Sequence, residues 1–85
     1  MNLDTETMEV VSGYGKARRQ VVLGIGKEYV IQPLNPRKTK NRDRRCVLLE
    51  FAPVSQHEPD YIKAKVRYLD SGRIGRIELE DLAPV

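Results

Sequence analysis

The sequence predicts an all-β fold, a small antiparallel barrel of roughly four to five strands with a one-turn 3₁₀-helix near the C-terminus. The first observation is strict alternation of apolar and basic residues over 61–68, the period of two that is typical of a half-buried strand. The second is the Asp-Ser-Gly turn at 70–72, because Asp can bond its own backbone and Gly can adopt a positive φ. The third is the return over 73–79 as a second strand, followed by a 3₁₀-type turn at 80–82. The predicted core face of the first strand consists of Ile62, Ala64, Val66 and Tyr68.

The 85 residues suffice for a single domain. Residues 1–15 are acidic and polar and end in Gly13-Tyr14-Gly15, so we expect a flexible N-terminal arm before one barrel domain over 16–85. No apolar run approaches the roughly 18 to 20 residues that span a membrane. The lone cysteine, Cys46, allows no intrachain disulfide. These features predict a soluble, cytoplasmic protein, present as a monomer or weak homo-oligomer.

The segment 16–25 is ambiguous between helix and strand. Ala17, Val21 and Ile25 have helical spacing, whereas Gly24, Gly26 and the β-branched residues favour an extended segment. We leave both possibilities open and prefer the extended one.

The segments 27–33 and 45–51 predict two further strands. The first places Tyr29 and Ile31 on one face, and Pro33 ends it. The second is apolar on both faces, with Val47, Leu49 and Phe51 on one and Cys46 and Leu48 on the other, so it requires a second cover. We expect residues 21–25 to supply that cover, residues 52–60 to form a loop bounded by prolines, and residues 83–85 to add a short edge strand.

Residues 26–82 resemble the SH3-like small barrels and, within them, the Tudor and KOW-type domains. The run from Val66 to Gly72, with Ile77 and Leu82, is similar to the Tudor skeleton of a hydrophobic-aromatic-x-Asp-x-Gly turn and a closing Leu. The run over 26–31 is similar to the first strand of KOW-like barrels. The resemblance implies the barrel fold. Ser71 and Arg73 stand where Tudor readers of methylated side chains carry an aromatic and an Asn, and the chain has no Trp, so an aromatic cage is not predicted.

The loop at 34–43 and the start of the next strand give the strongest functional signal. Six cations lie within nine residues, a density typical of sites that bind phosphate backbones, although a solvated loop would look similar. The outward face of the hairpin at 61–76 is basic too, and Tyr61 lies on it, where a base could stack. The acidic residues gather near the two ends of the chain, so we expect a basic side and an acidic side. The candidate nucleic-acid-binding residues are Arg37, Lys38, Lys40, Arg42, Arg44, Arg45, Lys63, Lys65, Arg67 and Tyr61, with Arg73 and Arg76 reinforcing the hairpin.

No catalytic, metal or cofactor site is predicted. His57 is the only histidine and has no nearby Cys or Ser-His-Asp order, so it is interpreted as a surface residue. Glu58 and Asp60 are too few ligands for calcium. Cys46 is interpreted as a small buried hydrophobe, with a thiolate encouraged by the neighbouring arginines as the alternative.

The sequence therefore predicts a noncatalytic binding module. The favoured partner is RNA or DNA, bound through its phosphates with weak sequence preference. The alternative is a protein-interaction module for an acidic partner or a partner strand, and a phage or mobile-element accessory protein of that kind would carry the same pattern.

Overall fold

The computed structural model describes residues 7–13, 15 and 18–85. These residues form seven strands and one 3₁₀ turn in two antiparallel sheets, so the all-β prediction is confirmed. The 3₁₀ turn lies one residue earlier than expected, and the short last strand is present as predicted. The elements are β1 (Thr7–Ser12), β2 (Arg19–Gly24), β3 (Glu28–Ile31), β4 (Arg45–Ser55), β5 (Glu58–Tyr68), β6 (Ile74–Glu78), η3 (Leu79–Asp81) and β7 (Leu82–Pro84).

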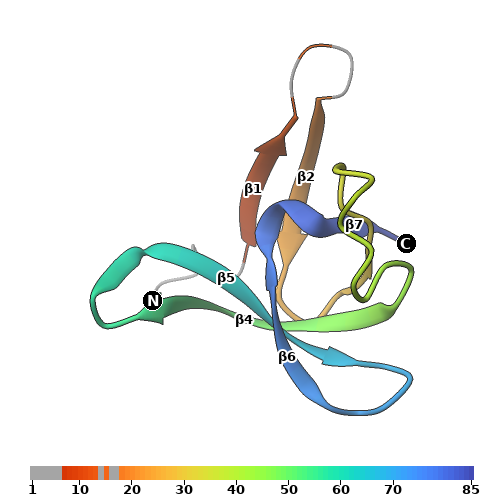
Figure 1. Ribbon diagram of the computed structural model, residues 1–85. Helices are drawn as coiled ribbons and strands as arrows, with labels where there is room; N and C mark the ends of the chain where they lie inside the picture. Colours follow the sequence, from red (N-terminus) through yellow and green to blue (C-terminus); the bar gives the residue numbers. More distant parts are fainter. Residues whose placement is uncertain (1–6, 14, 16–17) are drawn as a thin grey trace.

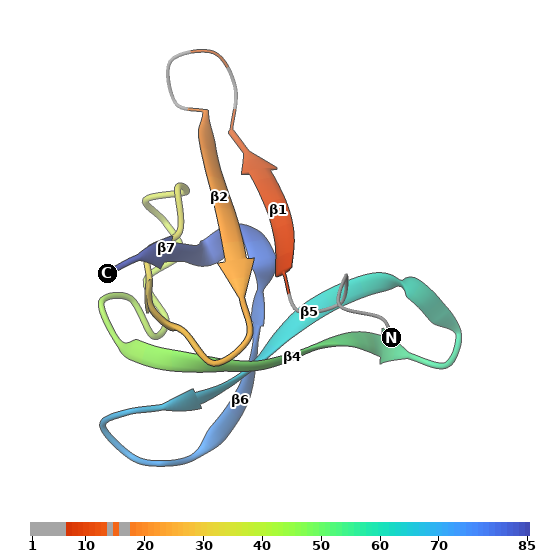
Figure 2. The ribbon, with the colours of Figure 1, turned by 180° about the vertical axis from the view of Figure 1, so that it is seen from behind.

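The larger sheet has five strands in the order β6-β5-β4-β3-β7. Four consecutive strands form a meander, and the last strand returns to pair with β3 on its free side. Among the described residues β6 and β7 remain as edges, so the sheets do not close on themselves. Figures 1 and 2 show the β1–β2 hairpin standing over this sheet, while the far halves of β4 and β5 extend away as an arm.

The β1–β2 hairpin corrects the expected N-terminal arm. Residues 7–12 pair with β2 along their whole length, from Thr7 opposite Gly24 to Ser12 opposite Arg19, so the arm interpretation is wrong for them. They form a strand because β2 offers a partner edge and Val10 packs against the core. Residues 1–6, 14 and 16–17 lie outside the described part. For Arg19–Gly24 the preferred extended conformation is confirmed.

A β-bulge in β4 corrects the expected faces of that strand. The pairing with β5 shifts between Leu48 and Glu50, so the strand carries one extra residue there and its side chains change phase. Cys46 and Leu48 therefore lie in the core, and Phe51, opposite Ala64, packs on the same side. The assignment of Phe51 to the face opposite Cys46 is wrong, because no alternation pattern reveals an inserted residue.

The prediction of a loop over residues 52–60 is also wrong. β4 and β5 continue through it as a hairpin joined at Gln56 and His57. Pro53 and Pro59 are tolerated because the pairing is interrupted by a second register shift between Pro53 and Ser55, near the end of the arm. His57 is exposed, as predicted.

The core is one cluster between the five-stranded sheet and β2. The expected cover is supplied by Val21 and Leu23, which lie on the Cys46 side of β4. The Tyr29 hydroxyl accepts a hydrogen bond from the backbone N–H of Gly24 at 2.7 Å, which ties β2 to β3. The remaining members of the buried cluster are Ile31, Leu48, Ala64, Val66, Tyr68, Ile77 and Leu82.

The turn at 70–72 and Gly75 beyond it fix the position of the Tyr68 ring. Gly72 has φ 75° and its N–H bonds the carbonyl of Tyr68 at 2.8 Å, as the turn prediction requires. Gly75 pairs in regular register with Val66, so no bulge lies there. Its missing Cβ instead leaves room for the Tyr68 ring, which lies against it. In the described part of the chain, no helix is long and apolar enough to cross a membrane.

Candidate functional site

The side chain of Arg42 is hydrogen-bonded to the backbone of its own loop, residues 34–43, which we call the basic loop. Its guanidinium donates hydrogen bonds to the carbonyls of Pro33, Asn35 and Lys38 at 3.2, 2.9 and 2.8 Å. This candidate phosphate contact therefore already donates to three backbone oxygens. Its role in the structure is to hold the loop in shape.

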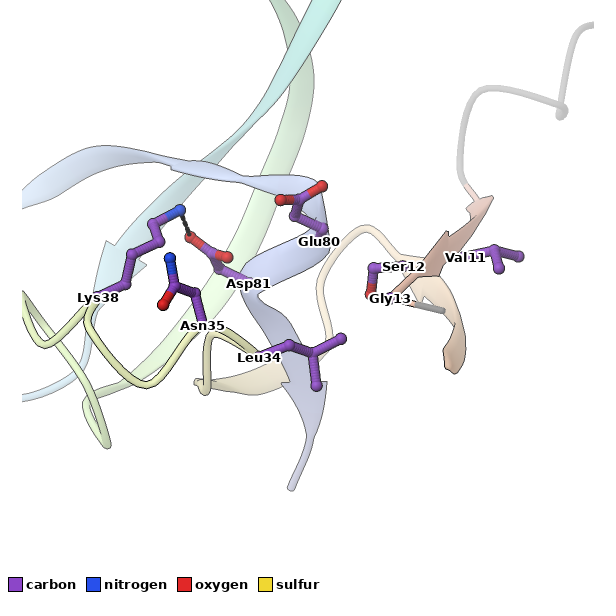
Figure 3. Close-up of a pocket in the computed structure, with 8 residues that line it drawn as sticks. All are labelled: Val11, Ser12, Gly13, Leu34, Asn35, Lys38, Glu80 and Asp81. Carbon is purple, nitrogen blue, oxygen red and sulfur yellow. Dashed lines mark hydrogen bonds and ion pairs between the residues drawn. The ribbon is translucent and has the colours of Figure 1, made fainter. Parts of the chain in front are cut away.

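Lys38 joins the loop to η3. Its ammonium lies 2.7 Å from a carboxylate oxygen of Asp81, whose residue is only 7% exposed (Figure 3). This hydrogen bond raises the pKa of Lys38 above its ordinary value. A hollow of about 450 Å³ surrounds the pair, and its charges are mixed. Its lining is Val11, Ser12, Gly13, Leu34, Asn35, Lys38, Glu80 and Asp81.

The basic face of β5 is paired with acids from its two neighbouring strands. Lys63 lies 3.5 Å from Glu78, and Lys65 lies 3.2 Å from Glu50. The bulge in β4 places Glu50 opposite Lys65. The Tyr61 hydroxyl donates to Glu78 at 2.5 Å, which raises the pKa of this tyrosine, although its ring remains exposed. Acidic and basic residues are therefore interleaved on this face, where the sequence predicted a basic track.

One concave region keeps a surplus of positive charge. This basic hollow, of about 610 Å³, lies between the basic loop, the turn after β5 and the edge strand β6. Four cations and one aromatic ring line it, and its lining contains no carboxylate. Three of these four cations, Lys40, Arg73 and Arg76, form no ion pair with another described residue. The lining residues are Lys40, Asn41, Arg44, Tyr68, Ser71, Arg73, Ile74 and Arg76.

Arg44 is held rigidly at the wall of the basic hollow. Its Nε and Nη2 donate to the two carboxylate oxygens of Asp70 at 3.0 and 2.7 Å, and its Nη1 donates to Asn41 at 2.7 Å. The guanidinium carbon lies 3.9 Å from the centroid of the Tyr68 ring. The hydrogen bonds to Asp70 raise the pKa of Arg44, and they lower the pKa of Asp70. Burial raises the pKa of Tyr68, against a smaller opposing effect of Arg44.

The other candidate residues lie outside the basic hollow. Arg45 pairs with Glu28 at 3.1 Å. Arg37 and Arg67 are exposed and have no ion pair among the described residues, but neither lines the hollow. Of the ten candidates, Lys40 and Arg44 are the two that line the basic hollow.

Arg73 and Arg76 complete the basic hollow, and sequence reasoning gave them only a supporting place. The one hint in the sequence was that both arginines follow the turn at 70–72. This turn lies near the end of the loop at 34–43 only because β3, β4, β5 and β6 are neighbours in the sheet. The polar residues Asn41 and Ser71 gave no signal, because their role is to orient Arg44.

Cys46 is fully buried, as predicted, and burial raises the pKa of its thiol to about 11. A thiol of this pKa stays protonated near neutral pH, so the reactive alternative is not supported. Across the described residues, no three His, Cys, Asp or Glu side chains gather as metal ligands. No family model, curated protein or solved structure matches the chain.

Proposed function

We propose that this chain is a noncatalytic SH3-like barrel module that binds nucleic acid at the basic hollow. The strand order supports the barrel resemblance, since a four-strand meander is followed by one 3₁₀ turn and a last strand that returns to the first. The observation that carries the function is the concave lining, which contains no carboxylate and four cations, three of which form no ion pair with another described residue. Such a lining attracts phosphate, and the released counterions supply the driving force.

The intramolecular ion pairs limit the size of this interface. Because Lys38, Lys63 and Lys65 already have acidic partners, they contribute little net charge to an approaching backbone. The cations left for phosphates at the hollow are Lys40, Arg73 and Arg76. We therefore expect a small footprint, with modest affinity and a salt slope of about −2, from roughly −0.7 per phosphate contact on a single strand.

The direct test is fluorescence anisotropy of a labelled single-stranded RNA and a labelled DNA duplex, at low and at physiological salt. The variant R73A/R76A removes two cations from the hollow, and R37A/R67A removes the same charge from exposed positions outside it. We expect the first variant to lose most binding and to flatten the salt dependence, while the second stays close to wild type. Absence of binding at low salt would refute the proposal, and equal losses would refute the hollow as its site.

A second candidate function is binding of an acidic protein strand. The observation that favours it is the open edge of β6 beside the hollow, where Ile74 is 52% exposed. Both partners would bind in a salt-dependent way, so salt alone does not separate them. Competition does, since polyphosphate would displace a nucleic acid and an acidic peptide of extended conformation would displace a strand.

A further inference from the structure

We propose that Arg44, lying on Tyr68, is a stacking platform for an unpaired nucleobase, so that the module selects single-stranded nucleic acid over duplex. This inference rests on the function proposed above and assigns Arg44 a different role from the phosphate contact that the sequence suggested. A base would lie flat on the guanidinium, while the cations around the basic hollow contact the flanking phosphates.

The hydrogen bonds of Arg44 disfavour it as a phosphate clamp. A guanidinium binds phosphate through its N–H edges, in its own plane. Three of its five N–H donors are taken, since Nε and Nη2 donate to Asp70 and Nη1 donates to Asn41. On the edge formed by Nε and Nη2, an approaching phosphate would have to displace a carboxylate held at 2.7 Å.

The two planar faces of the Arg44 guanidinium have different surroundings. One face lies over the Tyr68 ring, with 3.9 Å between the guanidinium carbon and the ring centroid. The side chain nevertheless retains 30% of its exposure, and Arg44 lines the basic hollow. With three of its five N–H donors bonded and one face covered, we assign the contact with a ligand to the opposite face. Guanidinium planes are established stacking partners for bases in RNA recognition.

The platform is rigid before any ligand arrives. Tyr68 is only 8% exposed, and its ring fits the space that the missing side chain of Gly75 leaves. Asp70 belongs to the turn after β5 and Asn41 to the loop before β4, so two segments distant in sequence fix one guanidinium. Little side-chain entropy is then lost when a base stacks on it.

The surrounding charges match a single strand and not a duplex. Lys40, Arg73 and Arg76 converge on one concave region, whereas the track along the hairpin is neutralised at Lys63 and Lys65. A duplex keeps its bases stacked inside and offers only its backbone to such a region. An unpaired strand offers both a phosphate and a free base face.

The test compares three labelled DNA probes on the wild-type protein: a short single strand, an abasic strand of equal length, and the duplex of that length. The abasic strand carries the same phosphates without the bases. We expect it to bind about 5- to 150-fold more weakly than the normal strand, from the stacking of one base. We expect the duplex to bind more weakly than the single strand as well.

The matched variants are R44K, which keeps the charge and removes the plane, and R76K, which makes the same exchange at a free cation. R44K should lose the preference for the base-containing strand without a change in salt slope, and R76K should keep it. A circular-dichroism melt checks the fold of each variant. Equal affinity of wild type for normal and abasic strands, or tighter binding of the duplex, would overturn the platform and leave the proposed function standing. Absence of binding to all three probes, and to the single-stranded RNA of the first assay, would overturn both.

Discussion

The close contact between Gly75 and Tyr68 predicts that G75A destabilises the protein only while the Tyr68 ring is present. A Cβ at position 75 would lie 2.7 Å from Cε2 and 2.9 Å from the hydroxyl of Tyr68, closer than side-chain atoms pack. The ring has little freedom to retreat, because it is 8% exposed and Arg44 lies over it at 3.9 Å. G75A should therefore force the ring and the guanidinium out of their places.

The expected change in the free energy of unfolding of G75A is the difference between two opposing effects. Overfilling a packed site costs about 1 to 3 kcal/mol, whereas replacing a strand glycine by alanine stabilises by roughly 0.5 to 1 kcal/mol through the unfolded chain. The net expectation is a loss of about 1 kcal/mol. For a domain of this size that corresponds to a fall in Tm of about 4 to 8 °C.

The assay is thermal and urea unfolding of wild type, G75A, Y68L and the double variant, followed by circular dichroism. Without the ring only the alanine effect remains, so in the Y68L background G75A should be neutral or stabilising. An equal loss in both backgrounds, or a gain in the wild-type background, would refute the account of the close contact.

Three further expectations concern the core and the loop. K38A leaves the buried carboxylate of Asp81 without its partner and should cost about 1 to 2 kcal/mol in urea unfolding, less than a fully buried pair because Lys38 is half-exposed; an unchanged midpoint would contradict this. V66D buries a charge at a fully buried position and should unfold the domain, whereas R67D on the exposed face of the same strand should leave it folded, and similar melting curves for the two would refute the face assignment. Because the pKa of Cys46 is raised from 9.0 to about 11, the unfolded thiol ionises first, so the free energy of unfolding should fall between these pH values, and C46A should lack this contribution.

The alternation at 61–68 and the turn at 70–72 predicted the central hairpin correctly, because both signals are local. Side chains of successive strand residues point to opposite faces whatever the rest of the chain does. A glycine with positive φ is likewise required by the turn itself. The order of the last elements, a 3₁₀ turn and a short strand, followed from the same kind of reading.

These errors share one physical cause, which is that they concern pairing with another strand. Residues 7–12 are polar enough to suggest an arm, and they form β1 because β2 supplies hydrogen-bonding partners. The prolines at 53 and 59 suggest a loop, and they are tolerated because the pairing of β4 with β5 shifts nearby. Neither pairing is visible in the composition of the segment itself.

The sequence by itself determined that the chain is all-β, where its central hairpin turns, and that its cations concentrate in one loop and one strand face. The tertiary structure decided which of those cations remain available. The bulge in β4 brings Glu50 to Lys65, the last 3₁₀ turn brings Asp81 to Lys38, and the turn after β5 brings Asp70 to Arg44. Charge is a property of each residue, but its neutralisation depends on register and on contacts across the fold, and these place Lys40, Arg73, Arg76 and the Arg44–Tyr68 stack around one hollow.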